Sequence, residues 1–362
     1  MPYAAHVLNA FILAVLLIDC LRRSQIPFPM ARPTERRDHI GLVPLIGGLG
    51  MFMAFILALS LLDRSLIGQS YLISGLLVLV TVGVVDDFVE LRPSFKLVAQ
   101  FSAAALMIIP NGRVLDIGNL LGVEGVQLGP LELLVSLCFV VGLTNAINMI
   151  DGVDGLAGGI VAAILFWLAM IASALGRPTE VAIILILLAA TIGFLAFNVR
   201  TPWRPRASVF MGDAGSMMLG ACVAYFTLML AAAPAAGSGS TAHASLPALC
   251  WLISIPVIDT LSLAIRRPLA GKSPFAADRW HIHHLMLSAG WSSAQVTGLL
   301  VGLSLLLGGI GFAGVVFGIP AWTMALGLLL IAAAHTVVVS RLSMAGIAPR
   351  PGVAQSNAPG IL

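Results

Sequence analysis

The chain has 362 residues, of which 59% are apolar and 10% are charged, whereas ordinary globular proteins are about 45–50% apolar and about 25% charged. This composition excludes a soluble enzyme, and it also excludes a disordered chain, which needs low hydrophobicity and high charge. A net charge of +3 from 19 basic and 16 acidic residues is too small to indicate a nucleic-acid partner. A polytopic membrane protein is the class that remains.

Eleven apolar stretches are long enough to cross a bilayer. The first lacks a basic leading region and a cleavage site, so we expect a retained helix and not a signal peptide. We predict an all-α polytopic bundle of about eleven transmembrane helices, with residues 1–340 as a single membrane domain and 341–362 as a flexible tail. The predicted spans are roughly 5–21, 41–62, 70–86, 95–110, 130–147, 158–175, 180–198, 213–233, 246–265, 295–317 and 320–340.

The four cysteines do not indicate a disulfide scaffold. Cysteine in an apolar run behaves as a small buried hydrophobe, and all four lie in such runs. We therefore expect buried thiols at Cys20, Cys138, Cys222 and Cys250.

The basic residues indicate the orientation of the bundle. With these spans, sixteen of the nineteen Lys and Arg residues lie on one side, and only Arg64, Arg113 and Arg177 lie on the other. Because cytoplasmic loops are enriched in Lys and Arg, the N-terminus is expected outside and the C-terminus in the cytoplasm. Two short apolar runs in the non-cytoplasmic connection 111–130 could form a small β-hairpin.

Carboxylates are costly at membrane depth, so those found there usually mark function. Most of them lie at span ends on the basic side. If the bundle is compact, five cytoplasmic ends converge on one pocket that faces the cytosol. The acidic residues at these ends are Asp86, Asp87, Asp151, Asp154, Asp213, Asp259 and Asp278.

Two segments combine a carboxylate with a helix end. Asp86 and Asp87 follow an apolar run and can bind a metal or act as a base, or they can form a solvated helix terminus. Lys96 can pair with a phosphate or serve as a positive-inside anchor. Asp213 lies between glycines at the start of a span, where free amide groups suit a phosphate, although an ordinary N-cap explains the residue equally well.

A polar stripe precedes the sixth span. Asn145, Asn148 and Asp151 recur every three residues and so share one helix face. The glycines at 152 and 155 then end the helix and let the backbone approach a ligand. The stripe can help hold a metal or bind a sugar or base, or it can be polar glue between helices.

Three of the seven histidines, His281, His283 and His284, fall within the last cytoplasmic loop, 266–294. Their spacing does not match the i, i+4 pair of a helical zinc site. Together with Arg266 and Arg279 they suit a diphosphate, and a histidine can exchange a proton near neutral pH. Scattered surface histidines are the alternative.

These motifs, in this order, resemble the polyprenyl-phosphate N-acetylhexosamine-1-phosphate transferases, a family of polytopic membrane enzymes. The matching segments are 44–48, 86–87, 145–155, 210–216 and 274–284. The His-Ile-His-His form is similar to the branch that acts with N-acetylglucosamine-1-phosphate and starts O-antigen and related glycans. In related proteins an acidic residue often occupies the position of Ala31. This chain has no carboxylate there, so any role of that residue in the relatives cannot be assigned to it.

The resemblance implies transfer of N-acetylhexosamine-1-phosphate from a UDP-sugar to undecaprenyl phosphate, at the cytoplasmic face of the bacterial inner membrane, with the lipid bilayer as surroundings. It implies Mg²⁺, with Mn²⁺ as an alternative. It assigns metal binding to Asp213, Asp86 and Asp87, and catalysis to Asp86, Asp87, His281, His283 and His284. It assigns substrate binding to Asn148, Asp151, Asp154 and Asn198, and the residue patterns described above add Lys96, Asn145, Arg266 and Arg279 to the predicted substrate-binding residues.

Several alternatives remain open from the sequence. The donor can be another UDP-N-acetylhexosamine or UDP-N-acetylmuramoyl-pentapeptide. Direct attack by the lipid phosphate is preferred over a covalent phosphosugar enzyme. A transporter is a distant alternative, because intramembrane carboxylates also mark ion paths. The oligomeric state, a homodimer included, is not determined.

Overall fold

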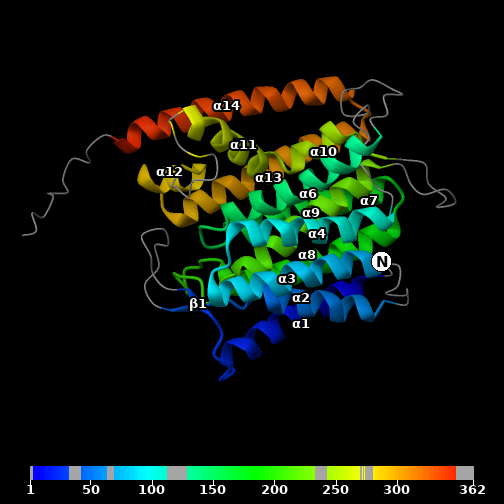
Figure 1. The fold of residues 1–362 in the computed structure, drawn as a ribbon, viewed down its shortest axis with the longest axis vertical. Coiled ribbons are helices and arrows are strands. Elements are labelled where there is room, and N and C mark those ends of the chain that lie inside the picture. The colour runs from blue at the N-terminus through cyan, green and yellow to red at the C-terminus, as the bar shows by residue number, and fades with distance from the viewer. Residues whose placement is uncertain are drawn as a thin grey trace, which may run out of the picture.

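The computed structural model describes residues 3–31, 42–62, 69–111, 129–232, 243–269, 271, 273 and 280–347. Throughout these residues the chain is almost entirely helical, and the long helices lie side by side in a bundle (Figure 1). The expected hairpin runs within 114–128 and the candidate residue Arg279 lie outside the described residues.

A helix is present at each of the eleven predicted spans, so the polytopic helical bundle is confirmed. Eight helices are long and apolar enough to cross a membrane, among the residues described: α1 (Ala4–Arg23), α3 (Ser70–Val89), α6 (Pro130–Ile150), α7 (Leu156–Ala174), α8 (Pro178–Asn198), α9 (Gly212–Ala231), α13 (Ser293–Val316) and α14 (Ala321–Ile347). The shorter elements are α2 (Gly47–Ser60), α4 (Pro93–Ile108), the 3-10 turn η2 (Ile109–Asn111), α10 (Leu246–Leu252), α11 (Ser254–Leu269) and α12 (Ile282–Ser288).

The ninth predicted span is not one straight helix. It is bent by 89° between α10 and α11. Pro256 lies in the first turn of α11, and a proline ring clashes with the carbonyl group four residues earlier, here that of Leu252 at the end of α10. This clash favours a kink or a break in the helix at this point.

Two predicted boundaries also differ. The second span begins at Gly47 and not at 41, because strand β2 (Val43–Pro44) pairs antiparallel with β1 (Met30–Ala31). The last helix continues to Ile347, past the predicted start of the tail at 341. The two-stranded ladder, Met30 with Pro44 and Ala31 with Val43, is a small addition to the all-α prediction.

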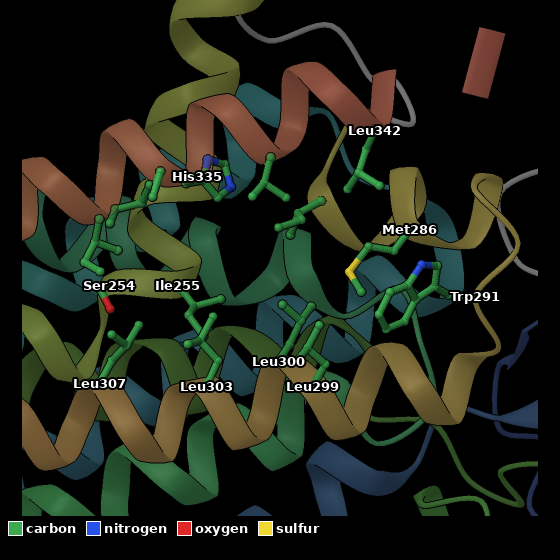
Figure 2. Close-up of a pocket in the computed structure, with 15 residues that line it drawn as sticks. Ser254, Ile255, Met286, Trp291, Leu299, Leu300, Leu303, Leu307, His335 and Leu342 are labelled. Carbon is green, nitrogen blue, oxygen red and sulfur yellow. The ribbon is translucent and has the colours of Figure 1, made fainter. Parts of the chain in front are cut away.

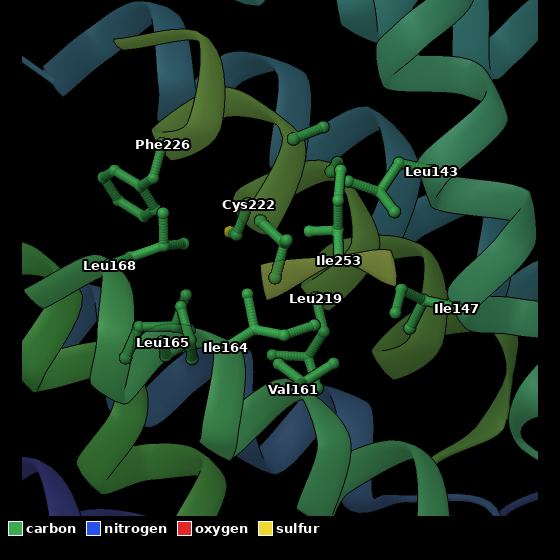
Figure 3. Close-up of a cluster of buried hydrophobic side chains, with 14 of the residues drawn as sticks. Leu143, Ile147, Val161, Ile164, Leu165, Leu168, Leu219, Cys222, Phe226 and Ile253 are labelled. Carbon is green, nitrogen blue, oxygen red and sulfur yellow. The ribbon is translucent and has the colours of Figure 1, made fainter. Parts of the chain in front are cut away.

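Helix α9 is the centre of the bundle. Its spanning window is 89% buried, whereas that of α14 is 11% buried. Figure 3 shows Leu219 and Phe226 of α9 among the buried side chains Ile147 of α6 and Ile164 of α7. The apolar outer faces of peripheral helices suit a hydrocarbon environment, which does not drive such side chains inward.

The prediction of four buried thiols is wrong for two of them. Cys222 is buried and Cys250 is partly buried, but Cys20 and Cys138 are exposed. All four are free. In a membrane bundle an apolar sequence context is equally consistent with contact to lipid, so it does not by itself predict burial against protein.

Glycines let α2, α3 and α9 approach closely. A Cβ atom at Gly48 would overlap the backbone of Gly215, and one at Gly83 would overlap the backbone of Ala214. Gly48 N also donates a hydrogen bond to Met211 O at 2.9 Å. Small residues at such contacts allow backbones to touch, and this contact brings the end of α3 beside the start of α9.

Candidate active site

Lys96 joins carboxylates from two other helices. Its Nζ lies 3.0 Å from Asp86 Oδ2 and 3.0 Å from Asp213 Oδ2. Asp86 is in the last turn of α3, Asp213 in the first turn of α9 and Lys96 in the first turn of α4. All three side chains are partly buried. Lys96 thus belongs to a partly buried cluster of charged side chains and is more than a surface anchor, and the carboxylates are not simply solvated.

Asp87 reaches the same helix start from α3. Its Oδ1 accepts a hydrogen bond from the Asp213 backbone N–H at 3.1 Å, while its Oδ2 is buried and has no hydrogen-bond partner among the described residues. Gly212 has φ +71°, and a Cβ there would overlap Asp87 Oδ2. Only glycine therefore leaves room for this carboxylate beside the helix start.

The N-cap explanation of Asp213 is wrong. The N-cap residue of α9 is Met211, and its side chain makes no capping hydrogen bond. The Asp213 carboxylate instead pairs with Lys96 and, through Oδ1, accepts a hydrogen bond from Asn148 Nδ2 at 3.1 Å. Asn148 also donates to Ser216 Oγ at 2.8 Å. The structure therefore brings Asp86, Lys96 and Asn148 together around Asp213, as the convergence of helix ends predicts.

The polar stripe divides between two roles. Asn148 joins the carboxylate cluster, whereas Asn145 Nδ2 donates to Gln100 Oε1 of α4 at 2.7 Å. That contact is the polar glue between helices considered as the alternative. Gln100 is 4% exposed, and the sequence did not single it out. Its signal was a polar residue four positions after Lys96, on the same helix face.

Asn198 fastens the backbone near the site. Its Oδ1 accepts from Gly155 N at 2.7 Å and its Nδ2 donates to Val209 O at 2.9 Å. Gly155 has φ +77° at the start of α7, so the loop is held in a left-handed turn that suits glycine. The buried amide thus joins α7 to the segment before α9, and its contact with a nucleotide stays a prediction.

Asp154 also fastens this loop. Its Oδ2 lies 2.7 Å from Arg200 Nε and accepts a hydrogen bond from Ala207 N at 3.1 Å. Asp151, by contrast, is the C-cap residue of α6. It directly precedes Gly152, which lies against the His283 ring. Neither placement tests substrate binding, which stays a prediction for both residues.

The histidine segment is anchored by Asp259, a carboxylate that the sequence placed at one of the converging span ends but without a role beside the histidines. Asp259 of α11 is 2% exposed. Its Oδ2 lies 2.8 Å from His281 Nδ1, and its Oδ1 accepts from Ile282 N at 3.0 Å. The sequence signal was a lone carboxylate within an apolar run, but its partner lies 22 positions away.

The histidines are packed against each other and are not scattered on the surface. His283 is fully buried, and its ring centroid lies 5.6 Å from that of His281 and 4.2 Å from that of His284. Burial, aided by these neighbouring imidazoles, lowers the pKa of His283 from 6.5 to about 3. His283 is therefore neutral at physiological pH, and the expected proton exchange near neutrality does not apply to it.

The loop after α6 contacts the histidines. A Cβ at Gly152 would lie 2.8 Å from His283 Nε2, which places the end of the polar stripe against this ring. Arg266 Nη2 donates to Trp280 O at 2.9 Å and so holds the chain just before His281. The end of the polar stripe and the histidine segment are therefore in contact, in agreement with the expected convergence of the cytoplasmic span ends.

These contacts lie at one end of the bundle. Helix α9 begins at that end beside Lys96, and at its other end Arg177 donates to the carbonyl oxygens of Met229 and Ala232. Arg22 stacks over Phe197, near the end of α8, with 5.7 Å between its Cζ and the ring centroid. The placement of Arg177 opposite Lys96 agrees with the predicted two-sided distribution of basic residues.

The carboxylate oxygens of this cluster suit a hard cation whose remaining ligands would come from the substrates. Across the described residues, no group of three acidic, histidine or cysteine side chains forms a ready-made metal cage. Mg²⁺ is usually held by one or two carboxylates, waters and substrate phosphates. The buried, unpartnered Oδ2 of Asp87 beside Asp213 fits that requirement.

Comparison with known proteins agrees with this arrangement. Residues 70–231 match glycosyl transferase family 4, a range that includes the Lys96 cluster. The chain is 32% identical over 297 residues to the undecaprenyl-phosphate alpha-N-acetylglucosaminyl 1-phosphate transferase of Escherichia coli O157:H7, covering 81% of this chain and 78% of that protein. Identity to the proteins of that name from Haemophilus influenzae and Yersinia pestis is 33% over 303 residues and 30% over 334 residues, covering 83% and 91% of this chain and 83% and 89% of those proteins.

The helical fold and these comparisons together define a multi-pass membrane transferase. The chain belongs to glycosyl transferase family 4. The resemblance drawn from its motifs is confirmed, including the similarity to the undecaprenyl-phosphate N-acetylglucosaminyl-1-phosphate transferase branch.

Proposed function

We propose that the protein transfers N-acetylglucosamine-1-phosphate from UDP-N-acetylglucosamine to undecaprenyl phosphate, forming undecaprenyl-diphosphate-N-acetylglucosamine and UMP. The observation that carries this proposal is the cluster in which Lys96 bridges Asp86 and Asp213 beside Asp87. A reaction that joins two phosphate anions needs a cation and well-placed polar groups. The names of the similar proteins support the choice of sugar and acceptor.

In the proposed reaction, an oxygen of the lipid phosphate attacks the β-phosphorus, which carries the sugar. The new P–O bond forms as the bond to the α–β bridging oxygen breaks, and UMP leaves with the electron pair. A phosphate monoester has a second pKa near 6, so the nucleophile is largely ionised at neutral pH. Asp87 orients this phosphate or removes its residual proton, while Lys96 offsets the negative charge that gathers at the site.

The carboxylates have distinct parts in this proposal. Asp86 already accepts from Lys96 and, at 2.7 Å, from Leu91 N, so its part is to hold Lys96. Asp213 and Asp87 would hold Mg²⁺, and Mn²⁺ is the second ion to test. When bound, the ion supplies charge neutralisation for the two phosphates. The histidine segment contacts the diphosphate from the side of the loop after α6.

We place this reaction at the cytoplasmic face of a bacterial inner membrane, as the first step of a lipid-linked surface glycan such as O-antigen. The gathering of basic residues at the site end supports this orientation. A transporter is not favoured, because the acidic residues are paired at one end of the bundle, whereas transporter sites lie near the bilayer midplane.

The test is UMP release by the purified protein given undecaprenyl phosphate, Mg²⁺ and a panel of UDP-sugars, with mass spectrometry of the lipid product. The panel includes UDP-N-acetylglucosamine, UDP-N-acetylgalactosamine and UDP-N-acetylmuramoyl-pentapeptide. We expect release that requires both lipid and divalent cation and is fastest with UDP-N-acetylglucosamine. Release with the muramoyl donor alone would correct the substrate, and no release with any donor would contradict the reaction.

A further inference from the structure

The buried carboxylate of Asp259 joins three helices. From α11 it contacts His281 and the backbone N–H of Ile282 at the start of α12. A third partner comes from α14, where His335 Nε2 lies 3.3 Å from Asp259 Oδ1. The last helix, which is otherwise the least buried of the spanning helices, therefore reaches the anchor of the histidine segment.

The surroundings of His335 are apolar. Its side chain is 11% exposed and lines a cavity of about 360 Å³ between α11, α12, α13 and α14, with Ile255, Met286 and Leu303 among the lining residues (Figure 2). In a low-dielectric environment a polar contact is stronger than in water, and losing it is more costly. A buried carboxylate also needs all of its partners to offset the cost of desolvation.

We infer that His335 is a positioning residue, which orients Asp259 and through it the imidazole of His281 for the transfer reaction. This inference rests on the proposed function and adds to it a residue outside the matched range 70–231. A carboxylate that contacts a histidine fixes the orientation and tautomer of the ring. Ile282 N donates a hydrogen bond to Oδ1, and His335 Nε2 approaches the same oxygen to 3.3 Å as a close polar contact that is not a formed hydrogen bond. The two contacts together favour one orientation of the carboxylate, with Oδ2 toward His281.

Paired substitutions separate this role from packing. The amide nitrogen of His335→Gln reaches about as far as Nε2, whereas that of His335→Asn reaches only about as far as Nδ1. We expect His335→Asn to lower kcat about tenfold with KM changed less than about twofold, and His335→Gln to stay within about threefold of the wild-type kcat. Val338→Ala, on the same helix and lining the same cavity, should leave both constants unchanged.

Two further measurements keep the test decisive. His335→Met fills the apolar cavity without a donor, so it should fold and lose kcat as the Asn variant does. In the Asp259→Asn background, His335→Asn should cause no further loss, because residues that act through one contact are not additive. Equal kcat for the Gln, Asn and Met variants, or fully additive losses, would overturn the positioning role.

Failure of the proposed function would look different. In that case the wild-type protein itself would release no UMP. Thermal unfolding midpoints of the wild type, both single variants and the double variant report the coupling of Asp259 and His335 without any activity. Absent coupling in these midpoints would overturn the inference even if the transferase activity is found.

Discussion

Asp86 and Asp87 are adjacent in the chain, yet their surroundings differ. Successive residues on a helix point about 100° apart. Asp86 therefore faces Lys96 and Leu91 N, which occupy both of its oxygens, whereas Asp87 faces α9 and keeps one buried oxygen without a partner among the described residues. This difference makes Asp87 the carboxylate available to the lipid phosphate or a cation.

We predict that Asp87→Asn lowers kcat by more than about 100-fold and that Asp86→Asn lowers it less. The asparagine at 87 can still accept the Asp213 N–H through Oδ1, so folding should be retained. UMP release and thermal midpoints measure both effects. Asp19→Asn, which removes ion pairs with Arg22 and Arg23 on α1, is the matched control and should leave kcat unchanged.

A greater loss at Asp86 than at Asp87 would reverse this assignment. The same variants address the covalent alternative. A labelled sugar phosphate trapped on the wild-type protein without lipid acceptor, and lost in Asp87→Asn, would contradict direct attack.

His283 gives a pH dependence of stability. Its pKa is about 3 in the folded protein and 6.5 as an ordinary value, so between these values the unfolded chain binds a proton that the folded protein does not. The contribution of His283 to the free energy of unfolding is therefore fully present above about pH 6.5 and falls as the pH drops, by at most about 1.4 kcal/mol per pH unit. Thermal midpoints between pH 7.5 and 5 should fall more steeply for the wild type than for His283→Gln. A steeper slope in the variant would show the opposite sign.

At this scale the sequence identified most of the clustered residues and missed two. Asp86, Lys96, Asn148 and Asp213 stood out because charged or amide groups at span ends are few. Gln100 and His335 were not predicted, and Asp259 was expected among the converging carboxylates but without a role at the histidines, because each is a single polar residue in an apolar run. Their partners lie on other helices, and periodicity shows which residues share a face but not which faces meet.

Among the elements, the contact of α3 with α9 positions the carboxylates. No side chain separates the two helices at Gly83, where a Cβ would overlap Ala214. The bend between α10 and α11 has a comparable effect, since it carries Asp259 to the start of α12. The span predicted at 246–265 is helical, but it is bent and not straight. The length of an apolar stretch alone does not predict the clash between a proline ring and a carbonyl group.

We predict that Gly83→Ala lowers activity strongly and destabilises the protein by about 1–3 kcal/mol, because the added methyl group must push α3 away from α9. Activity and the thermal midpoint are the measurements. Gly142→Ala is a matched control within helix α6, where a Cβ would meet nothing within 4 Å, and it should be neutral. Equal effects of the two changes would show that helix propensity, and not the close contact, is responsible.

For the molecule as a whole, the uneven distribution of basic residues along the sequence corresponds to an uneven distribution between the two ends of the bundle. Lys96 and Arg200 lie with the site at one end, and Arg177 binds carbonyl groups at the other. A bundle with this asymmetry is expected to insert with its basic end in the cytoplasm.

Reporter fusions test this orientation. Alkaline phosphatase, active only outside the cytoplasm, should be active when fused after Arg177 and inactive when fused after the exposed Trp203. Green fluorescent protein should show the reverse pattern, with comparable expression as the control. Phosphatase activity at both positions, or at Trp203 alone, would contradict the predicted orientation.

The sequence by itself determined that this protein is a polytopic membrane bundle, approximately where its helices lie and which polar segments matter. Apolar length, basic-residue asymmetry and rare carboxylates are local properties that need no knowledge of packing. Only the tertiary structure decided that Lys96 bridges two carboxylates, that Asn198 fastens backbone, and that Asp259 anchors the histidines. Those contacts depend on which helix faces touch, and that choice is made by glycine contacts and a proline bend between segments distant in the chain.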